Sequence, residues 1–112
     1  MHITERMLND ITVLDLDGNL VIGGSKEFRQ CITAIVNSDV RKLIVNLAGV
    51  QYMDSSGLGE LISCYTAMQE VSGHLRLLHL SQRLQHLLVI TKLITVFETF
   101  DSESAAVASF TA

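Results

Sequence analysis

The chain has 112 residues, of which 48% are hydrophobic and 18% charged, and a formal net charge of -4, so a single folded domain is expected rather than disorder. Its lysines and arginines form no basic run, which excludes the usual nucleic-acid-binding surface. No apolar run approaches the roughly 20 residues of a membrane-spanning helix, and the first residues lack a signal-peptide pattern, so no membrane insertion and a cytoplasmic location are expected.

The first half of the chain predicts a β-hairpin, a helix and a central strand. Residues 11–17 have β-branched, alternating character, and Asn9-Asp10 before them can turn a hairpin from a first strand over residues 3–8. Ser25 is the candidate N-cap of a helix whose apolar residues follow three- and four-residue steps: Phe28, Cys31, Ile32, Ile35 and Val36. The run 43–47 is apolar on both faces, which predicts a strand in the middle of a sheet.

The second half predicts further alternation of helices and strands. One helix is predicted to end at Gly73, in the left-handed conformation that closes many helices, and its apolar positions are Leu58, Leu61, Ile62, Tyr65 and Met68. Residues 75–80 predict a strand, and Val96-Phe97 a brief extended segment. Ser81 and Ser102 are candidate N-caps of two last helices, whose apolar residues are Leu84, Leu87, Leu88 and Val89 in one and Ala106, Val107 and Phe110 in the other. This order predicts an α/β domain with a mixed sheet of four or five strands and about four helices.

The cysteines and histidines predict no chemical site. Cys31 and Cys64 fall on the apolar sides of two predicted helices, where a small buried thiol is the commonest role and a disulfide is disfavoured in a reducing compartment. The histidines lack the close paired spacing of a zinc site: His2, His74, His79 and His86. We therefore expect no metal and no cofactor.

The stretch "YMDSSGLGEL", residues 52–61, places an acid, two hydroxyls and two glycines where a strand gives way to a helix. Asp54, Ser55 or Ser56 acting as the helix N-cap explains one polar residue but not three. Gly57 and Gly59 each weaken a helix by about 1 kcal/mol relative to alanine, which indicates that something approaches the backbone closely.

Two kinds of chemistry fit a serine in this stretch. A nucleophilic serine is disfavoured, because neither serine has the Gly-x-Ser-x-Gly spacing of the strand-turn-helix hydrolases. A phosphate acceptor is the other interpretation, since the first turn of a helix offers free backbone N–H groups and the positive end of the helix dipole. The added negative charge would act mainly on whatever docks against that surface.

The segment "LIVNLAGVQYMDSSGLGEL", residues 43–61, closely resembles the signature of STAS domains, and more narrowly that of the bacterial anti-sigma factor antagonists. In these proteins a strand leads through Asp-Ser-Ser-Gly-Leu-Gly into a helix. The stretches "LDLDGNL" before the first predicted helix and "VFETFDSESAAVASF" at the end fit the same order. The resemblance therefore implies one STAS domain over residues 1–112, without a catalytic site of its own.

The resemblance also implies a function. The chain would bind an anti-sigma factor, itself an ATP-dependent serine kinase of the GHKL type, and so release a sigma factor for transcription. Phosphorylation by that kinase would break the complex, and a PP2C-like phosphatase would restore it. By position in the motif, Ser56 is the implied phosphorylated serine with Ser55 as its rival, and Asp54 is the acid that tunes it. Gly57 and Gly59 are implied to admit the nucleotide of the kinase.

The implied docking surface consists of the turn 54–59, which includes Leu58, the helix flank at Glu60 and Ser63, and the loop 19–25. One departure affects this surface, because many antagonists read Gly-x-Leu-Asp where this chain reads Gly18-Asn19-Leu20-Val21. Val21 supplies no negative charge, so we expect either poorer phosphorylation or a partner that is more apolar near Asn19 and Val21. Val21 and Ile22 are either exposed apolar contacts or buried under the first helix.

Two alternatives stay open. The same fold occurs in non-switching STAS subunits of other assemblies, such as a lipid-transport ABC system or a stress-sensing complex, and a permanent partner with an unmodified Ser56 would favour that assignment. The remote alternative is a small serine hydrolase, in which replacing Ser56 by alanine would abolish turnover of an ester.

Overall fold

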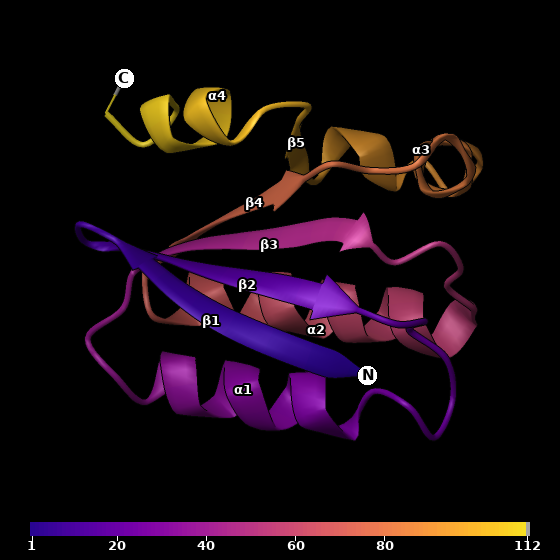
Figure 1. Ribbon diagram of the computed structural model, residues 1–112, viewed down its shortest axis with the longest axis horizontal. Helices are drawn as coiled ribbons and strands as arrows, with labels where there is room; N and C mark the ends of the chain where they lie inside the picture. The colour runs from indigo at the N-terminus through magenta and orange to yellow at the C-terminus, as the bar shows by residue number, and fades with distance from the viewer. Residues whose placement is uncertain (112) are drawn as a thin grey trace.

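The computed structural model describes residues 1–111, which form a five-stranded sheet with four α-helices (Figure 1). The strands lie side by side in their order along the chain. Strand β1 (His2–Leu8) is antiparallel to β2 (Ile11–Asp17), and the next three are each parallel to the strand before: β3 (Lys42–Gly49), β4 (His74–Leu78) and β5 (Glu98–Phe100). The predicted fold class, a mixed sheet with about four helices, is confirmed.

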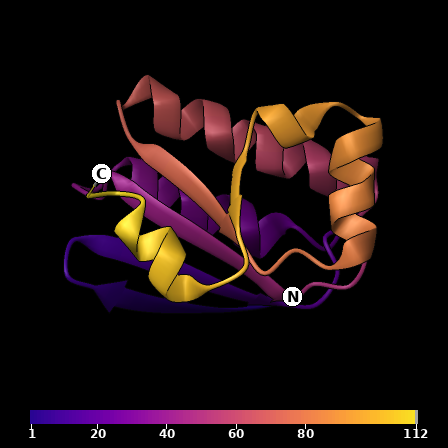
Figure 2. The ribbon, with the colours of Figure 1, turned by 90° about the horizontal axis from the view of Figure 1, so that it is seen from above.

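The helices cover the two faces of the sheet unequally. Helices α1 (Lys26–Val36) and α2 (Ser55–Glu70) lie side by side on one face, and the short α4 (Glu103–Ala108) lies over the other (Figure 1). Helix α3 (Gln82–Ile90) lies at one end of the sheet, next to the start of α2 (Figure 2). A 3-10 turn, Leu93–Thr95, leads from α3 towards β5.

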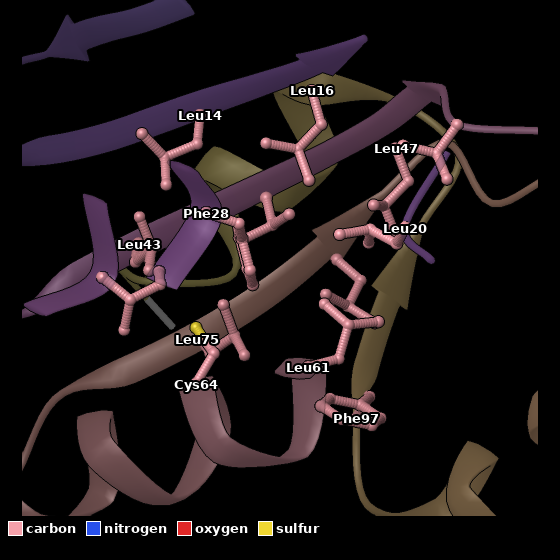
Figure 3. Close-up of a cluster of buried hydrophobic side chains, with 14 of the residues drawn as sticks. Leu14, Leu16, Leu20, Phe28, Leu43, Leu47, Leu61, Cys64, Leu75 and Phe97 are labelled. Carbon is pink, nitrogen blue, oxygen red and sulfur yellow. The ribbon is translucent and has the colours of Figure 1, made fainter. Parts of the chain in front are cut away.

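The main hydrophobic core fills the space between the sheet and the pair α1 and α2. Figure 3 shows Leu61 and Cys64 pointing from α2 towards side chains of the strands. The helix carries its buried residues at helical spacing, because Gly57, Leu61, Cys64 and Met68 recur at three- and four-residue steps. A smaller cluster lies under α4 and consists of Ile11, Val13, Ile44, Leu78 and Ala106.

Hydrogen bonds confirm Ser81 and Ser102 as helix N-caps and select Asp54 among the three candidates at the start of α2. The side chains of Asp54, Ser81 and Ser102 accept backbone N–H groups three residues further on, at 3.0, 3.2 and 3.1 Å. The fourth prediction is only half right, because Ser25 stands at the start of α1 but its side chain makes no capping hydrogen bond. Its backbone, with φ of -107° and ψ of 9°, lacks the extended conformation of the other three caps, from which a side chain reaches the first turn of a helix.

The end of α2 differs from the prediction. The left-handed residue is Ser72, with a φ of 60°, and not Gly73. Its N–H donates to the Gln69 carbonyl at 3.0 Å and that of Gly73 to the Met68 carbonyl at 2.7 Å, which is the Schellman arrangement. A Cβ at Gly73 would lie 2.7 Å from Met68 Cε, so this glycine serves packing rather than a positive φ.

Two strand boundaries also need correction. Strand β4 ends at Leu78 rather than Leu80, because His79 has a φ of 59° and turns the chain out of the sheet. The extended segment predicted at Val96-Phe97 lies instead at Glu98–Phe100, since the 3-10 turn ends only at Thr95 and Val96 still has helical backbone angles. Pairing with β4 fixes this short strand, with Glu98 opposite Arg76.

The apolar faces of the helices were predicted well except at two positions. Ile62 and Val89 are 39% and 55% exposed, so neither belongs to the core. Cys64 is buried on the inward side of α2, as predicted, and its burial raises the pKa of the thiol to about 12. Cys31 is half-buried, and both cysteines are free, as predicted.

No α-helix within residues 1–111 combines the length and the hydrophobicity that crossing a bilayer requires.

Candidate functional site

The candidate site is the turn between β3 and α2. It lies at the end of the sheet where the loop from β2 to α1 also passes (Figure 1). The two segments are joined by backbone hydrogen bonds: the Leu20 N–H donates to the Tyr52 carbonyl at 3.2 Å, and the Asp54 N–H donates to the Leu20 carbonyl at 3.1 Å. The turn and the loop that sequence analysis grouped as one docking surface are therefore in contact.

Asp54 holds these two segments together with its carboxylate. One oxygen, Oδ1, accepts the Gly57 N–H at 3.0 Å, and the other, Oδ2, accepts the Ile22 N–H at 3.0 Å. The hydrogen bond from Gly57 and then that from Ile22 lower the pKa of the Asp54 carboxyl below its ordinary value. Asp54 is thus the N-cap of α2, which makes Ser55 and Ser56 the first two residues of the helix.

The two glycines of the turn have different surroundings. Gly57 is buried against the loop, where a Cβ would lie 2.1 Å from the Leu20 carbonyl oxygen and 2.7 Å from Leu20 Cβ. Leu20 itself is buried in the main core (Figure 3). At Gly59 a Cβ would meet nothing within 4 Å. Packing within the chain accounts for Gly57, whereas Gly59 faces open space and has no such explanation.

The side chains of Ser55 and Ser56 take no part in holding the turn together. Across residues 1–111, no hydrogen bond is found from either hydroxyl, because the cap is provided by Asp54. Ser55 is exposed and Ser56 is half-buried. The hydrogen bonds that hold the turn therefore do not involve the hydroxyls of Ser55 and Ser56.

Adjacent serines on a helix face different sides, and here each side carries an arginine. Ser55 lines a mostly apolar groove between the start of α2 and α3, together with Leu58 and Arg83. The Arg83 guanidinium lies 6.0 Å from the ring centre of Tyr52 in this groove. On the other side, Glu60 of α2 lines a groove against α1 and forms an ion pair with Arg29, at 3.4 Å between Nε and Oε1.

The remaining predicted surface residues lie around this turn. Asn19 and Ser63 are exposed, and Val21 is half-buried. Ile22 is 79% exposed, so of the two alternatives left open for this residue, an exposed apolar contact is the one observed. Sequence analysis missed Arg29, Arg83 and Tyr52, because their pairing depends on how α1 and α3 pack and no motif marks it.

Neither a metal site nor a catalytic triad is assembled at the turn. Within residues 1–111, no group of three or more His, Cys, Asp or Glu residues is placed to hold a metal ion. His86 lines the same groove as Ser55, but the Asp54 carboxylate binds backbone N–H groups rather than orienting a histidine. The relay of acid, histidine and serine that activates a hydroxyl is thus not formed here.

Comparison with known proteins assigns the chain to a family. The model of the STAS domain matches residues 2–106. The anti-sigma-B factor antagonist of Staphylococcus aureus is 33% identical over 76 residues, which are 68% of this chain and 70% of that protein.

Solved structures share the fold. The anti-sigma-factor antagonist (STAS) domain protein from Planctomyces limnophilus has a TM-score of 0.87 at 16% identity and covers 98% of both chains. The Bacillus cell fate determinant SpoIIAA, in its phosphorylated form, has a TM-score of 0.76 at 22% identity, over 97% of this chain and 99% of its own. At these identities the likeness is one of fold.

Proposed function

The chain belongs to the STAS domain family and, within it, to the anti-sigma factor antagonists, and on that premise we propose that it is a binding module switched by phosphorylation. Its partner is an anti-sigma factor that is a serine kinase of the GHKL type. The unmodified chain binds this kinase and so frees a sigma factor. Phosphorylation of Ser56 ends the binding, and a PP2C-like phosphatase restores it. ATP and its metal belong to the kinase.

The observation that carries the proposal is that some residues of the turn hold its structure while its two serines do not. Asp54 and Gly57 have structural reasons to be there, since one caps α2 and fastens the loop while the other leaves room for Leu20. Ser55 and Ser56 have none in the described chain. A rigid turn that presents spare hydroxyls at the positive end of a helix is suited to receive a phosphate without rearrangement.

The surface around the turn suits a protein partner. Ile22 projects from the loop on one side, and the groove beside Ser55 is lined largely by apolar side chains of α2 and α3. A phosphate adds a charge of about -1.5 to -2, so a partner seated on this surface would have to desolvate that charge or be repelled by it. Binding and phosphorylation would then exclude each other.

The test is phosphorylation by the GHKL-type kinase encoded in the same genome, followed by intact mass and peptide mapping. One added phosphate is expected on Ser56, with loss of the kinase complex by gel filtration. Ser56→Ala should stay unmodified and bound, whereas the matched control Ser55→Ala should be phosphorylated normally. Val21→Asp should raise the rate if the missing loop acid limits the reaction.

Other results would point elsewhere. No phosphate, under conditions where a known substrate of that kinase is modified, would favour the non-switching subunit with a permanent partner. A phosphate on Ser55 alone would move the switch by one residue. Hydrolysis of an ester probe that disappears in Ser56→Ala would favour the hydrolase and overturn the proposal.

A further inference from the structure

An ion pair joins α1 to α2 one helical turn beyond Ser56. Arg29 Nε lies 3.4 Å from Glu60 Oε1, and the two side chains are 62% and 19% exposed. This distance is longer than the roughly 2.7–3.2 Å of a good N–H···O hydrogen bond. Because the Arg29 side chain is mostly exposed and the geometry is poor, the pair contributes little to stability, so Arg29 is held loosely and can be drawn to a stronger anion.

Helix geometry brings this ion pair close to Ser56. Ser56 and Glu60 are four residues apart on α2, so their Cβ atoms lie about 5–6 Å from each other. Side chains on a helix lean towards its N-terminus, so the Glu60 carboxylate leans towards the turn of Ser56, and the Arg29 guanidinium lies within reach of that carboxylate. Ser55 has Gly59 at the same spacing and lines the other groove, next to Arg83.

We infer that Arg29 is the internal counter-ion of a phosphate on Ser56, and that Glu60 keeps Arg29 in place until the phosphate is added. This inference rests on the proposed phosphorylation of Ser56. A phosphate group offers three oxygens and a charge near -2, which a guanidinium binds in a bidentate manner and in preference to one carboxylate. Phosphorylation thereby transfers Arg29 from Glu60 to the phosphate.

The transfer of Arg29 leaves the surface with a phosphate on Ser56 and with a Glu60 carboxylate that has lost its partner. Before phosphorylation Glu60 is neutralised by Arg29, and afterwards it is a free carboxylate four residues from a phosphate of the same sign. Gly59, where a Cβ would meet nothing within 4 Å, stands next to Glu60 and three residues after Ser56. A partner that fits the unmodified surface therefore meets the phosphate and an uncompensated Glu60 together.

The test uses protein with phosphoserine inserted at position 56 during translation, so that no kinase is needed. A phosphorus NMR titration then measures the second pKa of the phosphate, about 6 for a free phosphoserine. Arg29→Gln should raise this pKa by about half a unit, because an opposite charge nearby favours the dianion, and solvent screening limits the effect. Glu60→Gln should lower it, since the competing carboxylate is removed.

Control variants distinguish the effect of Arg29 on the phosphate pKa from the effect of other positive charges nearby. Lys26 lies one turn before Arg29 on α1, so Lys26→Gln tests the loss of a nearby positive charge that makes no ion pair with Glu60. Its effect on the pKa should be less than half that of Arg29→Gln. Arg29→Lys should restore part of the lost shift, and phosphoserine at position 55 should be insensitive to Arg29→Gln. The other charged group of the turn, Asp54, is unchanged throughout.

The outcomes are distinct. Equal effects of Arg29→Gln and Lys26→Gln, or none from Arg29→Gln, would overturn the role of Arg29 whatever the kinase does. If the titration behaves as expected while the kinase leaves Ser56 unmodified, the counter-ion geometry is supported and the proposed function is the part that fails.

Discussion

The two ends of α2 are closed in different ways. At the C-terminal end, Ser72 and Gly73 donate backbone N–H groups to the last carbonyls of the helix, and the closure involves only neighbouring residues. At the N-terminal end, closure depends on a distant segment, because Asp54 accepts an N–H from Ile22 and Gly57 packs on Leu20. Both ends contain a glycine without room for a side chain, but only the N-terminal end contains polar residues that the closure does not use.

The difference shows where function is to be sought. At the C-terminal end every unusual residue is explained by a local bond or contact. At the N-terminal end, bonds and contacts of this kind explain Asp54 and Gly57. They do not explain Ser55, Ser56 and Gly59. A residue without a structural reason, placed in a rigid setting, is the better candidate for interaction with a partner.

The largest effect is expected from Gly57→Ala. Its Cβ would lie 2.1 Å from a backbone oxygen of Leu20, which cannot move without shifting the loop, so we expect a loss of about 3 kcal/mol or more in the free energy of unfolding. Gly73→Ala should cost less, about 1 kcal/mol, because its closest contact is the flexible end of Met68. Urea unfolding measures both, and similar losses at the two glycines would break the comparison.

Asp54→Asn is expected to lower the free energy of unfolding by a smaller amount that depends on pH. The folded chain lowers the pKa of the Asp54 carboxyl, so this group stabilises the fold above its unfolded pKa, near 4, and that contribution disappears as the pH falls through the folded pKa. The wild type should therefore be more stable than the variant at pH 7, and the difference should shrink below about pH 4.

The measurement is urea unfolding of both proteins from pH 7 down to pH 2.5. Asp10 and Asp15 also have lowered pKa values, through hydrogen bonds from Lys42 and Arg6, but they are present in both proteins and cancel in the difference. A constant difference at all pH values would mean that the charge of Asp54 is not what fastens the turn.

Much of the fold could be predicted because the local signals agreed with the tertiary structure. The strand 11–17 has the predicted bounds, and the hydroxyls of Ser81 and Ser102 cap their helices as serines commonly do. The predictions failed where packing decided against a local preference. Glycine is favoured at a left-handed position, yet the close approach of Met68 made Gly73 necessary one residue later.

The site could be predicted only in part, for the same reason. A motif names the turn but says nothing about which residues of α1 and α3 lie beside it, so Arg29 and Arg83 were missed. The motif also could not tell the two glycines apart, since the space available to a Cβ depends on Leu20, more than 30 residues earlier in the chain. Conversely, the short β5 was misplaced because only its pairing with β4 defines it.

The smallest effect, and one of opposite sign, is expected from Gly59→Ala. Its Cβ meets nothing within 4 Å, and alanine favours a helix over glycine, so the variant should be more stable by about 0.5–1 kcal/mol. If glycine stands here to let a partner approach, the same variant should lose affinity for the kinase while gaining stability, a combination that no folding defect produces. Urea unfolding and a binding titration on one sample measure both. Greater stability with unchanged affinity would leave Gly59 without a role in docking and would restrict the functional part of the turn to the serines.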